Sequence, residues 1–497
     1  MESVKVTKKD HVHLRISASP SVLQEISDFF TFEVPGAKFT PSYKFKQWDG
    51  KIRLLHMFSG ELYLGLHKQL KEFCQTRGYV YSSVGIEDST SSVTPKELKE
   101  FMNGLSLCAH GTDIEIRAYQ IEAMLEAINR KRVLMLSPTA SGKSLILYGL
   151  VRWYQPQVRQ QLIIVPNTSL VEQMYTDFQE YSTKNGWNGK TECACIYSGK
   201  EKVFSAPVVI STWQSLFRKP KAFFERFDVI YGDEAHLYTA KSLTGIFHKT
   251  TNTPYKIGTT GTLNGTKCHE MVLEGLFGPV YKVTTTKQLM DDNYLADLFI
   301  HCLVLEYSPA EKKAAAKKTF RYADEMQFLV AHPARNAFIK QLALNQEGNT
   351  LLLFQFVKKH GTLLYGMIRE AVRDERKVFF VHGEIDAEDR ERIREIVEHE
   401  TNAIIIASVG VFSQGVNIRN LHNIILASPS KSRIRNLQSI GRGLRTADDK
   451  IRCTLFDIAD DLSWKSHRNH TLLHFIERVK IYAEEVFRYK LRTLRLF

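Results

Sequence analysis

The feature that most constrains this chain is a strand, a loop of small residues and a helix that follow one another between residues 132 and 153. Residues 132–136 are mostly apolar and predict a short buried strand, and residues 145–153 predict a helix. The eight residues between them read Ser-Pro-Thr-Ala-Ser-Gly-Lys-Ser. A loop that ends in Gly-Lys-Ser between a strand and a helix is typical of a phosphate-binding loop. The alternative is an ordinary strand–turn–helix connection.

Each residue type in this loop suits a triphosphate. The loop N–H groups and the positive end of the following helix form an anion cradle. Gly142 permits close approach of the backbone, Lys143 can reach the β- and γ-phosphates, and the Ser144 hydroxyl can hold Mg²⁺. The first position of the motif, usually glycine, is Ser137 here. ATP and Mg²⁺ are therefore the predicted cofactors, and the predicted phosphate-binding residues are Pro138, Thr139, Ala140, Ser141, Gly142, Lys143 and Ser144.

Length and composition place the chain among multidomain globular proteins. Its 497 residues predict about three domains, and a hydrophobic content of 43% can supply their cores. No apolar run approaches the roughly 20 residues of a membrane helix, and the N-terminus lacks the apolar core of a signal peptide, so a cytoplasmic protein is expected. The seven cysteines are scattered, which favours reduced core thiols over a metal site. A net charge of +13 suits a polyanionic partner.

The N-terminal 90 residues contain a basic and aromatic segment. Residues 43–46 and 51–55 predict two strands of a hairpin joined by a turn at residues 48–50, with one aromatic and one basic face. Basic side chains can neutralise phosphates without reading sequence. The alternative, compatible with the first, is that the aromatic residues fill a small core while the lysines are solvated. The candidate nucleic-acid contacts are Lys44, Lys46, Trp48, Lys51 and Arg53.

Polar residues follow the further strands of the first half. These strands are expected at residues 161–166, 203–210, 228–231 and 255–259. Asp233 and Glu234 come directly after the third of them, where Asp233 can complete a Mg²⁺ shell and Glu234 can orient and deprotonate the attacking water. The hydroxyls of Thr260 and Thr262 either link the hydrolysis site to a neighbouring domain or belong to a plain turn. Gln120, upstream of the phosphate loop, can recognise adenine through its amide.

A second series of strands and helices begins near residue 300 without a second phosphate loop. Its strands are expected at residues 303–307, 350–355, 377–381, 403–407, 423–427 and 453–458. Arg442 and Arg445 lie three residues apart on one helical face and can reach across a cleft to neutralise charge on the γ-phosphate. Residues 470–497 are amphipathic and basic, which predicts a C-terminal helix packed on this second domain.

Taken together, these segments resemble the ordered motifs of superfamily 2 helicases. The motifs are Arg-x-Tyr-Gln at 117–120, the phosphate loop at 137–144, Val-Pro at 165–166 with Thr168 and Gln173, Ser-Thr-Trp-Gln at 211–214, Asp-Glu-Ala-His at 233–236, Thr-Gly-Thr at 260–262, Gln-Gly-Val-Asn at 414–417 and Gln-x-x-Gly-Arg-x-x-Arg at 438–445. The resemblance implies two RecA-like domains with ATP between them. It also implies nucleotide-site roles for Arg117, Gln120, Gly415, Asn417 and Gln438, and nucleic-acid contacts by Thr168, Thr212, Gln214 and Ser408.

Residues 29–55 also resemble the N-terminal domain of the UvsW family of bacteriophage recombination helicases, and the similarity runs through the whole chain. The resemblance implies an ATP-dependent DNA helicase or translocase that acts on Holliday junctions, forks and R-loops. Its partners would be branched, duplex and single-stranded DNA and RNA–DNA hybrid, and the chain would act as a monomer in the host cytoplasm if a phage encodes it.

The expected fold class is α/β, with two tandem RecA-like parallel-sheet domains, a small α+β N-terminal domain and a C-terminal helix. The expected divisions are an N-terminal DNA-binding domain at 1–90, motor domains at 91–285 and 286–462, and the C-terminal helix at 463–497.

Three alternatives remain open at this point. An RNA helicase shares the Asp-Glu-Ala-His motif, although Arg117 to Gln120 and the Gln438 form look more like DNA-repair and restriction motors. A restriction-type duplex translocase would be accompanied by a nuclease constellation, and none is evident. A nucleic-acid scaffold with an inactive ATPase disagrees with the intact Lys143, Glu234 and Arg445.

Overall fold

A computed structural model describes most of the chain. The described residues are 2–86, 93–109, 111–197, 205–263, 265–317, 319–372, 376–413, 418, 420–428, 432, 440–441, 444 and 452–497. Contacts divide the chain into two units, one formed by residues 1–137 and 142–284 and the other by residues 285–497 together with 138–141. Within the described residues, no helix is both long enough and apolar enough to cross a membrane.

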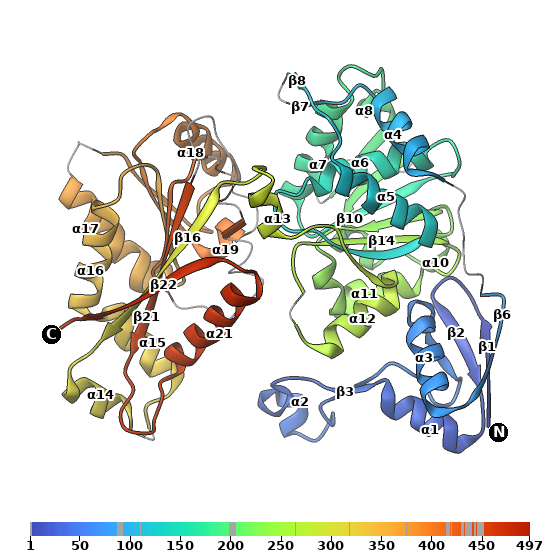
Figure 1. The fold of residues 1–497 in the computed structure, drawn as a ribbon, viewed down its shortest axis with the longest axis horizontal. Coiled ribbons are helices and arrows are strands. Elements are labelled where there is room, and N and C mark those ends of the chain that lie inside the picture. The colour runs from blue at the N-terminus through green and yellow to red at the C-terminus, as the bar shows by residue number, and fades with distance from the viewer. Residues whose placement is uncertain are drawn as a thin grey trace. The chain divides into compact units, whose positions relative to one another are not determined.

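The first unit begins with a small α+β domain (Figure 1). Its mixed sheet has the order β5-β2-β1-β6, in which β1 is antiparallel to β2 and parallel to β6. Alternate residues of β1 and β2 are buried, as expected for a sheet with one covered face. The elements are β1 (Ser3–Lys8), β2 (His13–Ser17), α1 (Pro20–Phe29), β5 (Glu61–Tyr63), α3 (His67–Arg77) and β6 (Val80–Val84).

The predicted hairpin at 43–55 is wrong in its first strand. The segment before the turn forms a short helix, α2 (Pro41–Lys44), whose N-cap Thr40 accepts a hydrogen bond from the Tyr43 N–H. Pro41 at the first helical position favours this helix over a strand. The second predicted strand is present as β4 (Lys51–Arg53), and it pairs antiparallel with β3 (Thr31–Glu33).

The rest of the first unit is built on a seven-stranded sheet in which every pairing is parallel. The order is β11-β12-β10-β13-β14-β9-β15. The strands are β9 (Arg132–Leu136), β10 (Gln161–Val165), β11 (Cys193–Ile196), β12 (Val208–Thr212), β13 (Val229–Gly232), β14 (Tyr255–Thr260) and β15 (Val280–Lys282). Strand β12 starts later than the predicted 203–210, directly after Pro207, which lacks the N–H that a central strand donates.

Helices flank this sheet on both sides (Figure 1). They are α4 (Pro95–Gly104), α5 (Ala118–Arg130), α6 (Lys143–Tyr154), α7 (Thr168–Tyr181), α8 (Gly189–Glu192), α9 (Trp213–Phe217), α10 (Lys221–Phe224), α11 (Lys241–His248) and α12 (Lys267–Phe277). A parallel sheet covered on both faces is buried throughout, which explains why its strands are continuous apolar runs.

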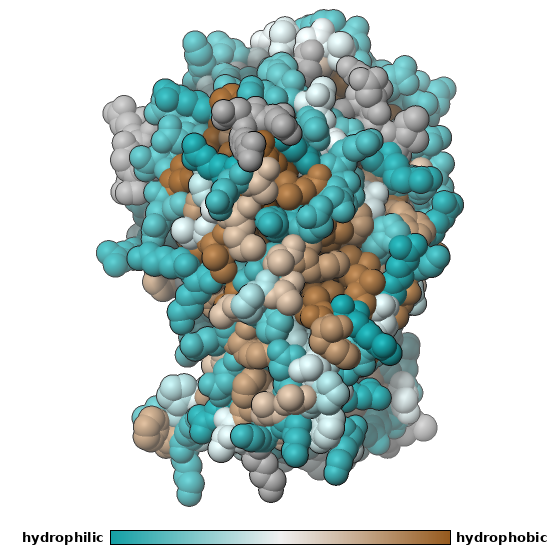
Figure 2. Space-filling view, turned by 90° about the vertical axis from the view of Figure 1, so that its left-hand side faces the viewer, coloured by the Kyte–Doolittle hydropathy of each residue, from teal (hydrophilic) through white to brown (hydrophobic). Residues whose placement is uncertain are grey.

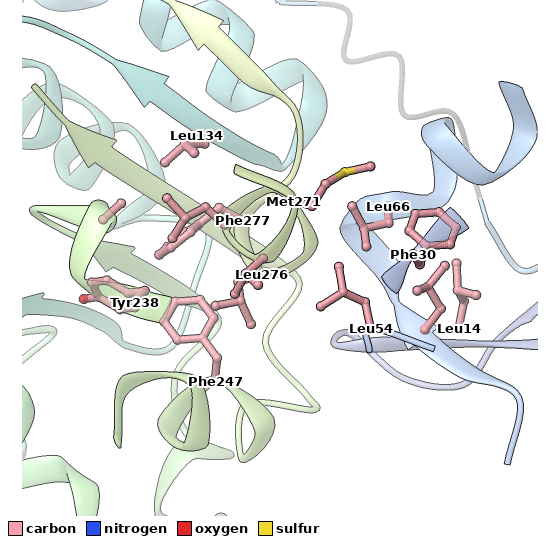
Figure 3. Packing of buried hydrophobic residues seen from close by; sticks show 14 of the residues in the cluster. Leu14, Phe30, Leu54, Leu66, Leu134, Tyr238, Phe247, Met271, Leu276 and Phe277 are labelled. Atoms are coloured by element: carbon pink, nitrogen blue, oxygen red, sulfur yellow. The ribbon is translucent and has the colours of Figure 1, made fainter. Parts of the chain in front are cut away.

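One hydrophobic cluster joins the N-terminal domain to this sheet (Figure 3). Leu66 and Leu14 of the small domain belong to the same cluster as Leu276 and Phe277 of α12. The backbones approach so closely that a Cβ atom on Gly65 would lie 2.0 Å from the carbonyl oxygen of Glu274. The small domain therefore packs on α12 directly rather than through a flexible tether.

The second unit contains another seven-stranded parallel sheet, ordered β18-β19-β17-β20-β21-β16-β22. Its strands are β16 (Asp297–Glu306), β17 (Thr350–Phe354), β18 (Val378–Val381), β19 (Ile404–Ser408), β20 (Asn423–Leu426), β21 (Arg452–Asp461) and β22 (Arg488–Arg495). Its helices are α13 (Thr286–Asp291), α14 (Pro309–Ala315), α15 (Tyr322–Ala331), α16 (Pro333–Leu344), α17 (Thr362–Val372), α18 (Ala387–His399), α19 (Val409–Ser413) and α21 (His470–Glu484).

The core of the second unit holds two buried ion pairs. Arg335 forms two hydrogen bonds to Asp460, of 2.8 and 3.0 Å, and Arg478 binds Asp457 in the same bidentate way. Each carboxylate also accepts a tyrosine hydroxyl, so its charge is fully engaged. The face drawn in Figure 2 is mostly hydrophilic, with hydrophobic residues gathered near its centre.

The C-terminal segment differs from the single helix that was predicted. Helix α21 ends at Glu484, and residues 488–495 form β22, an edge strand parallel to β16. The sequence of β22 alternates Arg488, Lys490 and Arg492 with Tyr489 and Leu491, a period of two that fits a strand. A C-terminal basic strand therefore replaces the second half of the predicted helix.

Candidate nucleotide and nucleic-acid site

The predicted phosphate loop has the expected strand before it and helix after it. β9 ends at Leu136, and α6 begins at Lys143, two residues earlier than predicted. Ala140 and Gly142 both have positive φ angles, of 66° and 80°, so the loop turns tightly before the helix begins. The Lys143 ammonium donates to the Ser137 carbonyl at 3.1 Å, and the Ser141 hydroxyl donates to the Pro138 carbonyl at 2.7 Å.

Gly142 is required by its contact with Gln120 as well as by its φ angle. A Cβ atom at position 142 would lie 2.3 Å from Gln120 Nε2. The Gln120 side chain is buried, and its Oε1 accepts the Arg117 N–H at 2.9 Å. The Arg117 guanidinium donates to the Tyr119 hydroxyl at 2.9 Å. The structure thus places the predicted adenine-recognising glutamine against the phosphate loop. Its side-chain Nε2 faces Gly142, while its side-chain Oε1 accepts the Arg117 N–H at the start of α5.

Ser144 has a hydrogen-bond partner that the sequence does not reveal. Its hydroxyl lies 2.9 Å from the hydroxyl of Tyr181, the last residue of α7. Tyr181 is 37 positions along the chain and belongs to no motif, so no signal in the sequence identifies it.

The acidic pair follows β13, on the same edge of the sheet as the phosphate loop. Asp233 is buried, and its Oδ1 accepts the hydroxyl of Thr259 at 2.8 Å. Burial and the neighbouring Glu234 carboxylate raise the pKa of Asp233 above its ordinary value, while the Lys143 ammonium and the Thr259 hydroxyl act in the opposite direction. Two adjacent carboxylates near one ammonium form a site that fits a divalent cation, because such a cation would relieve their mutual repulsion.

A chain of polar contacts leads from the acidic pair to β14. Glu234 has a positive φ of 46°, an uncommon conformation for a residue with a side chain. Its carboxylate lies 3.2 Å from Nδ1 of His236, and the same nitrogen lies 3.0 Å from the Thr260 hydroxyl. Thr260 in turn donates to the Thr262 carbonyl at 3.0 Å.

Strand β14 lies between β13 and β9 in the sheet, which explains these contacts. Its threonines reach the acidic pair on one side, and the Thr260 carbonyl accepts the Ser137 N–H of the phosphate loop on the other. Thr260 therefore connects His236, beside the acidic pair, with the phosphate loop, and a link from this segment to a neighbouring domain stays a prediction.

The candidate nucleic-acid contacts on the first sheet differ in their exposure to solvent. Thr168 begins α7 and is exposed, and Gln214 on α9 is exposed with a long 3.5 Å contact to the Pro166 carbonyl. Thr212 is different, since its hydroxyl is buried and lies 3.1 Å from that of Ser215. β10 and β12 are neighbours, so all three residues lie at one edge of the sheet. Ser408, at the end of β19 in the second unit, is also buried.

Around α2 and β4, the basic candidates are exposed and two aromatic residues are as well. Lys44, Lys46, Lys51 and Arg53 are exposed, and Arg53 forms an ion pair with Asp49. Trp48 is partly buried, and its indole N–H donates to the Lys51 carbonyl at 2.8 Å. Phe45, which the predicted hairpin places on its aromatic face, is 75% exposed and so does not fill a core, and Phe39, just before α2, is 81% exposed.

Several predicted residues lie outside the described part of the chain. They are Gly415, Asn417, Gln438, Arg442 and Arg445, all from the second unit.

A parallel sheet that ends in a phosphate loop and an acidic pair, followed by a second sheet of the same kind, defines the chain as a superfamily 2 helicase with two RecA-like domains. Family models agree with this class. Residues 3–84 match the N-terminal domain of the DNA helicase UvsW, residues 113–265 match the res subunit of type III restriction enzymes, and residues 333–447 match the helicase conserved C-terminal domain.

Comparison with individual proteins identifies the family to which the chain belongs. The chain is 34% identical to the ATP-dependent DNA helicase UvsW of enterobacteria phage T4 over 99% of this chain and 100% of that protein. The crystal structure of T4 UvsW aligns with this structure over 100% of both chains, with a TM-score of 0.53. A DNA 3′–5′ translocase of Sulfurisphaera tokodaii is 22% identical over 67% of this chain and 80% of its own length. The protein belongs to the UvsW family of ATP-dependent DNA helicases.

Proposed function

We propose that this chain uses ATP hydrolysis to translocate on and remodel branched DNA, including Holliday junctions, forks and R-loops. The observation that carries the ATPase part is the arrangement at the edge of the first sheet. There, Lys143 follows β9, the acidic pair follows β13, and the threonines of β14 contact both sides. The DNA part is supported by the full-length similarity to a protein named as a DNA helicase.

The residues of this edge take the following roles. The loop amides and Lys143 bind the β- and γ-phosphates. Ser144 and Asp233 would hold Mg²⁺, which neutralises phosphate charge when bound. Glu234 orients and deprotonates the attacking water, and His236 Nδ1 lies 3.2 Å from its carboxylate. Pro138, Thr139, Ala140, Ser141 and Gly142 complete the loop that surrounds the phosphates.

The remaining nucleotide-site roles follow the family pattern. Gln120 and Arg117 would bind the adenine end of ATP, which agrees with the packing of Gln120 against Gly142. Arg442 and Arg445 would complete the charge neutralisation, with Gly415, Asn417 and Gln438 alongside them in the second domain.

DNA contacts are proposed at two places. Thr168 and Gln214 are exposed at the edge of the first sheet where strand ends meet, and their polar side chains can bind a DNA backbone. Thr212 and Ser408 are buried, so they would support neighbouring backbone contacts instead. In the N-terminal domain, the exposed residues around α2 and β4 would bind duplex DNA, and these are Lys44, Lys46, Trp48, Lys51 and Arg53.

The activity is tested by removing the catalytic groups singly. Lys143→Ala and Glu234→Gln should each abolish ATP turnover while DNA binding largely survives, because neither residue contacts DNA in this scheme. Full ATPase activity in either variant would disprove the site.

The substrate class is tested separately, by measuring ATPase stimulation side by side with a four-way junction, a fork, linear duplex, an R-loop and RNA. Stronger stimulation by branched DNA supports the proposal. Stimulation by single-stranded RNA and not by DNA would indicate an RNA helicase, and equal stimulation by linear duplex without strand separation would indicate a duplex translocase.

A further inference from the structure

A basic cavity of about 780 Å³ lies between the N-terminal domain and the first motor sheet. The N-terminal domain contributes Lys8, Lys68 and Lys71 to its lining, and the motor domain contributes Arg130, Lys131 and Arg132. Among the described lining residues the sole carboxylate is Glu72. A cavity of this size is in the range of ordinary ligand sites, and its charge predicts an anionic occupant.

Two cations lie in or next to the wall of this cavity and donate to carbonyl groups. Arg132 lines the cavity, whereas Lys256 lies behind the lining residue His11, whose carbonyl oxygen both cations contact. Lys256 is completely buried, and its ammonium donates to the carbonyl oxygens of His11, Thr250 and Thr253 at 2.8–2.9 Å. Arg132 donates to the carbonyl oxygens of His11 and Leu276, both at 2.6 Å, while its buried Nε has no acceptor among the described residues.

The Asp10 carboxylate favours the charged forms of both Arg132 and Lys256. Asp10 accepts the N–H groups of Val12 and His13 at 2.6 and 2.7 Å. The pKa of His11 is lowered to about 4 by burial together with the positive charges of Lys8, Lys256 and Arg132. This shift is consistent with an excess of positive charge around the cavity. The basic groups of the described lining outnumber its one carboxylate, Glu72, so an external anion in the cavity would offset the excess positive charge.

The cavity is distinct from the nucleotide site. Arg132 is the first residue of β9 and lines the cavity, whereas the phosphate loop follows Leu136, the last residue of the same strand. The first and last residues of this five-residue strand are roughly 13 Å apart. The cavity is therefore at the amino edge of the parallel sheet, and the ATP machinery is at the carboxyl edge.

We propose that this cavity binds the sugar–phosphate backbone of a DNA strand, as a second DNA-binding site of the branched-DNA motor proposed above. Its described lining contains ammonium and guanidinium groups but no Phe, Tyr or Trp that would stack on a base. Such a site recognises phosphates and not base identity. Lysines on both domains can contact successive phosphates of one strand, so DNA bound here would link the N-terminal domain to the motor sheet.

The test replaces three lysines that line the cavity. The variant is Lys68→Ala, Lys71→Ala and Lys131→Gly, and the last change suits the backbone because Lys131 has a φ of 60° that glycine adopts without strain. A matched control removes three exposed lysines of the same unit outside the cavity, namely Lys96, Lys99 and Lys190.

Binding of forked DNA is then measured at several salt concentrations. The cavity variant should bind at least about 100-fold more weakly near 0.1 M salt, and the slope of log K against log salt should fall by about 2 to 3, since each phosphate contact contributes about 0.9. The control should keep the wild-type slope, and both variants should keep the DNA-independent ATPase rate. A cavity variant with the slope and affinity of the control would overturn the proposal.

Amine acylation identifies the ligand directly. Forked DNA should protect Lys68 and Lys71 from acylation in the wild-type chain, and inorganic phosphate or ATP at the same phosphate concentration should not. Protection by phosphate or ATP and not by DNA would mean a small-anion site and would refute the DNA assignment. The same labelling of Lys143→Ala separates the two hypotheses, because that variant should lose ATPase activity yet retain DNA protection of the cavity.

Discussion

The hydrogen bond between Thr259 and Asp233 gives a direct test of how the hydrolysis site is held together. The Thr259 hydroxyl donates to Asp233 Oδ1 at 2.8 Å, and both side chains are buried. Thr259→Val keeps the shape of the side chain and removes the donor. The Asp233 carboxylate then loses a group that opposes the rise in its pKa, and its orientation toward the metal position is no longer fixed.

The size of the effect follows from the charge on Asp233. A hydrogen bond to a charged group contributes about 1.5–3 kcal/mol, and partners of a metal-ligating carboxylate typically change metal affinity or activity about 10- to 100-fold. At about 1.4 kcal/mol per factor of ten, the two ranges agree. We therefore expect Thr259→Val to raise the Mg²⁺ concentration for half-maximal ATPase activity by at least about tenfold.

Two further variants make the Mg²⁺ titration decisive. Thr259→Ser keeps the hydroxyl and should restore a half-saturation close to that of the wild type. Thr253→Val removes another buried threonine hydroxyl of the same unit, which donates to the Phe227 carbonyl at 2.9 Å, and should leave the Mg²⁺ dependence unchanged. A folded Thr259→Val protein with the wild-type half-saturation would refute the reasoning.

Three other predictions concern stability. Arg335→Leu leaves the buried Asp460 carboxylate without its ion pair and should cost about 3–5 kcal/mol in urea unfolding, a loss that replacing Asp460 by Leu as well should largely reverse. Gly65→Ala places a Cβ atom 2.0 Å from the Glu274 carbonyl oxygen, so amide exchange in α12 should accelerate. Burial lowers the pKa of His360 from 6.5 to about 3, so its unfolded form binds the extra proton and stability should fall by about 1.4 kcal/mol per pH unit below pH 6.5, a slope that His360→Asn should reduce.

The strands of both sheets are the part of the fold most accessible from sequence. Parallel strands covered on both faces are apolar runs, and the segment 132–136 coincides with β9 as predicted. The outermost strands of a sheet are harder to predict. Strands β11 and β15 are short and lie at the two ends of the first sheet, where pairing with one neighbour creates them, so local composition carries little signal.

The C-terminal segment shows the same limit of local composition, here where a helix is followed by an edge strand. Residues 470–484 are amphipathic with a helical period and form α21. Residues 488–495 continue the basic and apolar mixture, but their alternation has a period of two, which favours a strand. Pairing with β16 completes the strand, because β16 offers on this side a row of hydrogen-bonding groups that only another strand can satisfy.

In the candidate site, the sequence reveals the residues that belong to local motifs but not the residues that contact them through space. Lys143 and Asp233 could be identified because each lies in a short motif whose chemistry depends on adjacent residues. The donor to Asp233 is Thr259, one residue before the Thr-Gly-Thr motif, and it becomes visible only once β14 is placed between β13 and β9. The partner of Ser144 is Tyr181, which lies outside every motif. Motifs therefore locate the charges of this site, while the order of strands in the sheet determines which neutral groups hold those charges in position.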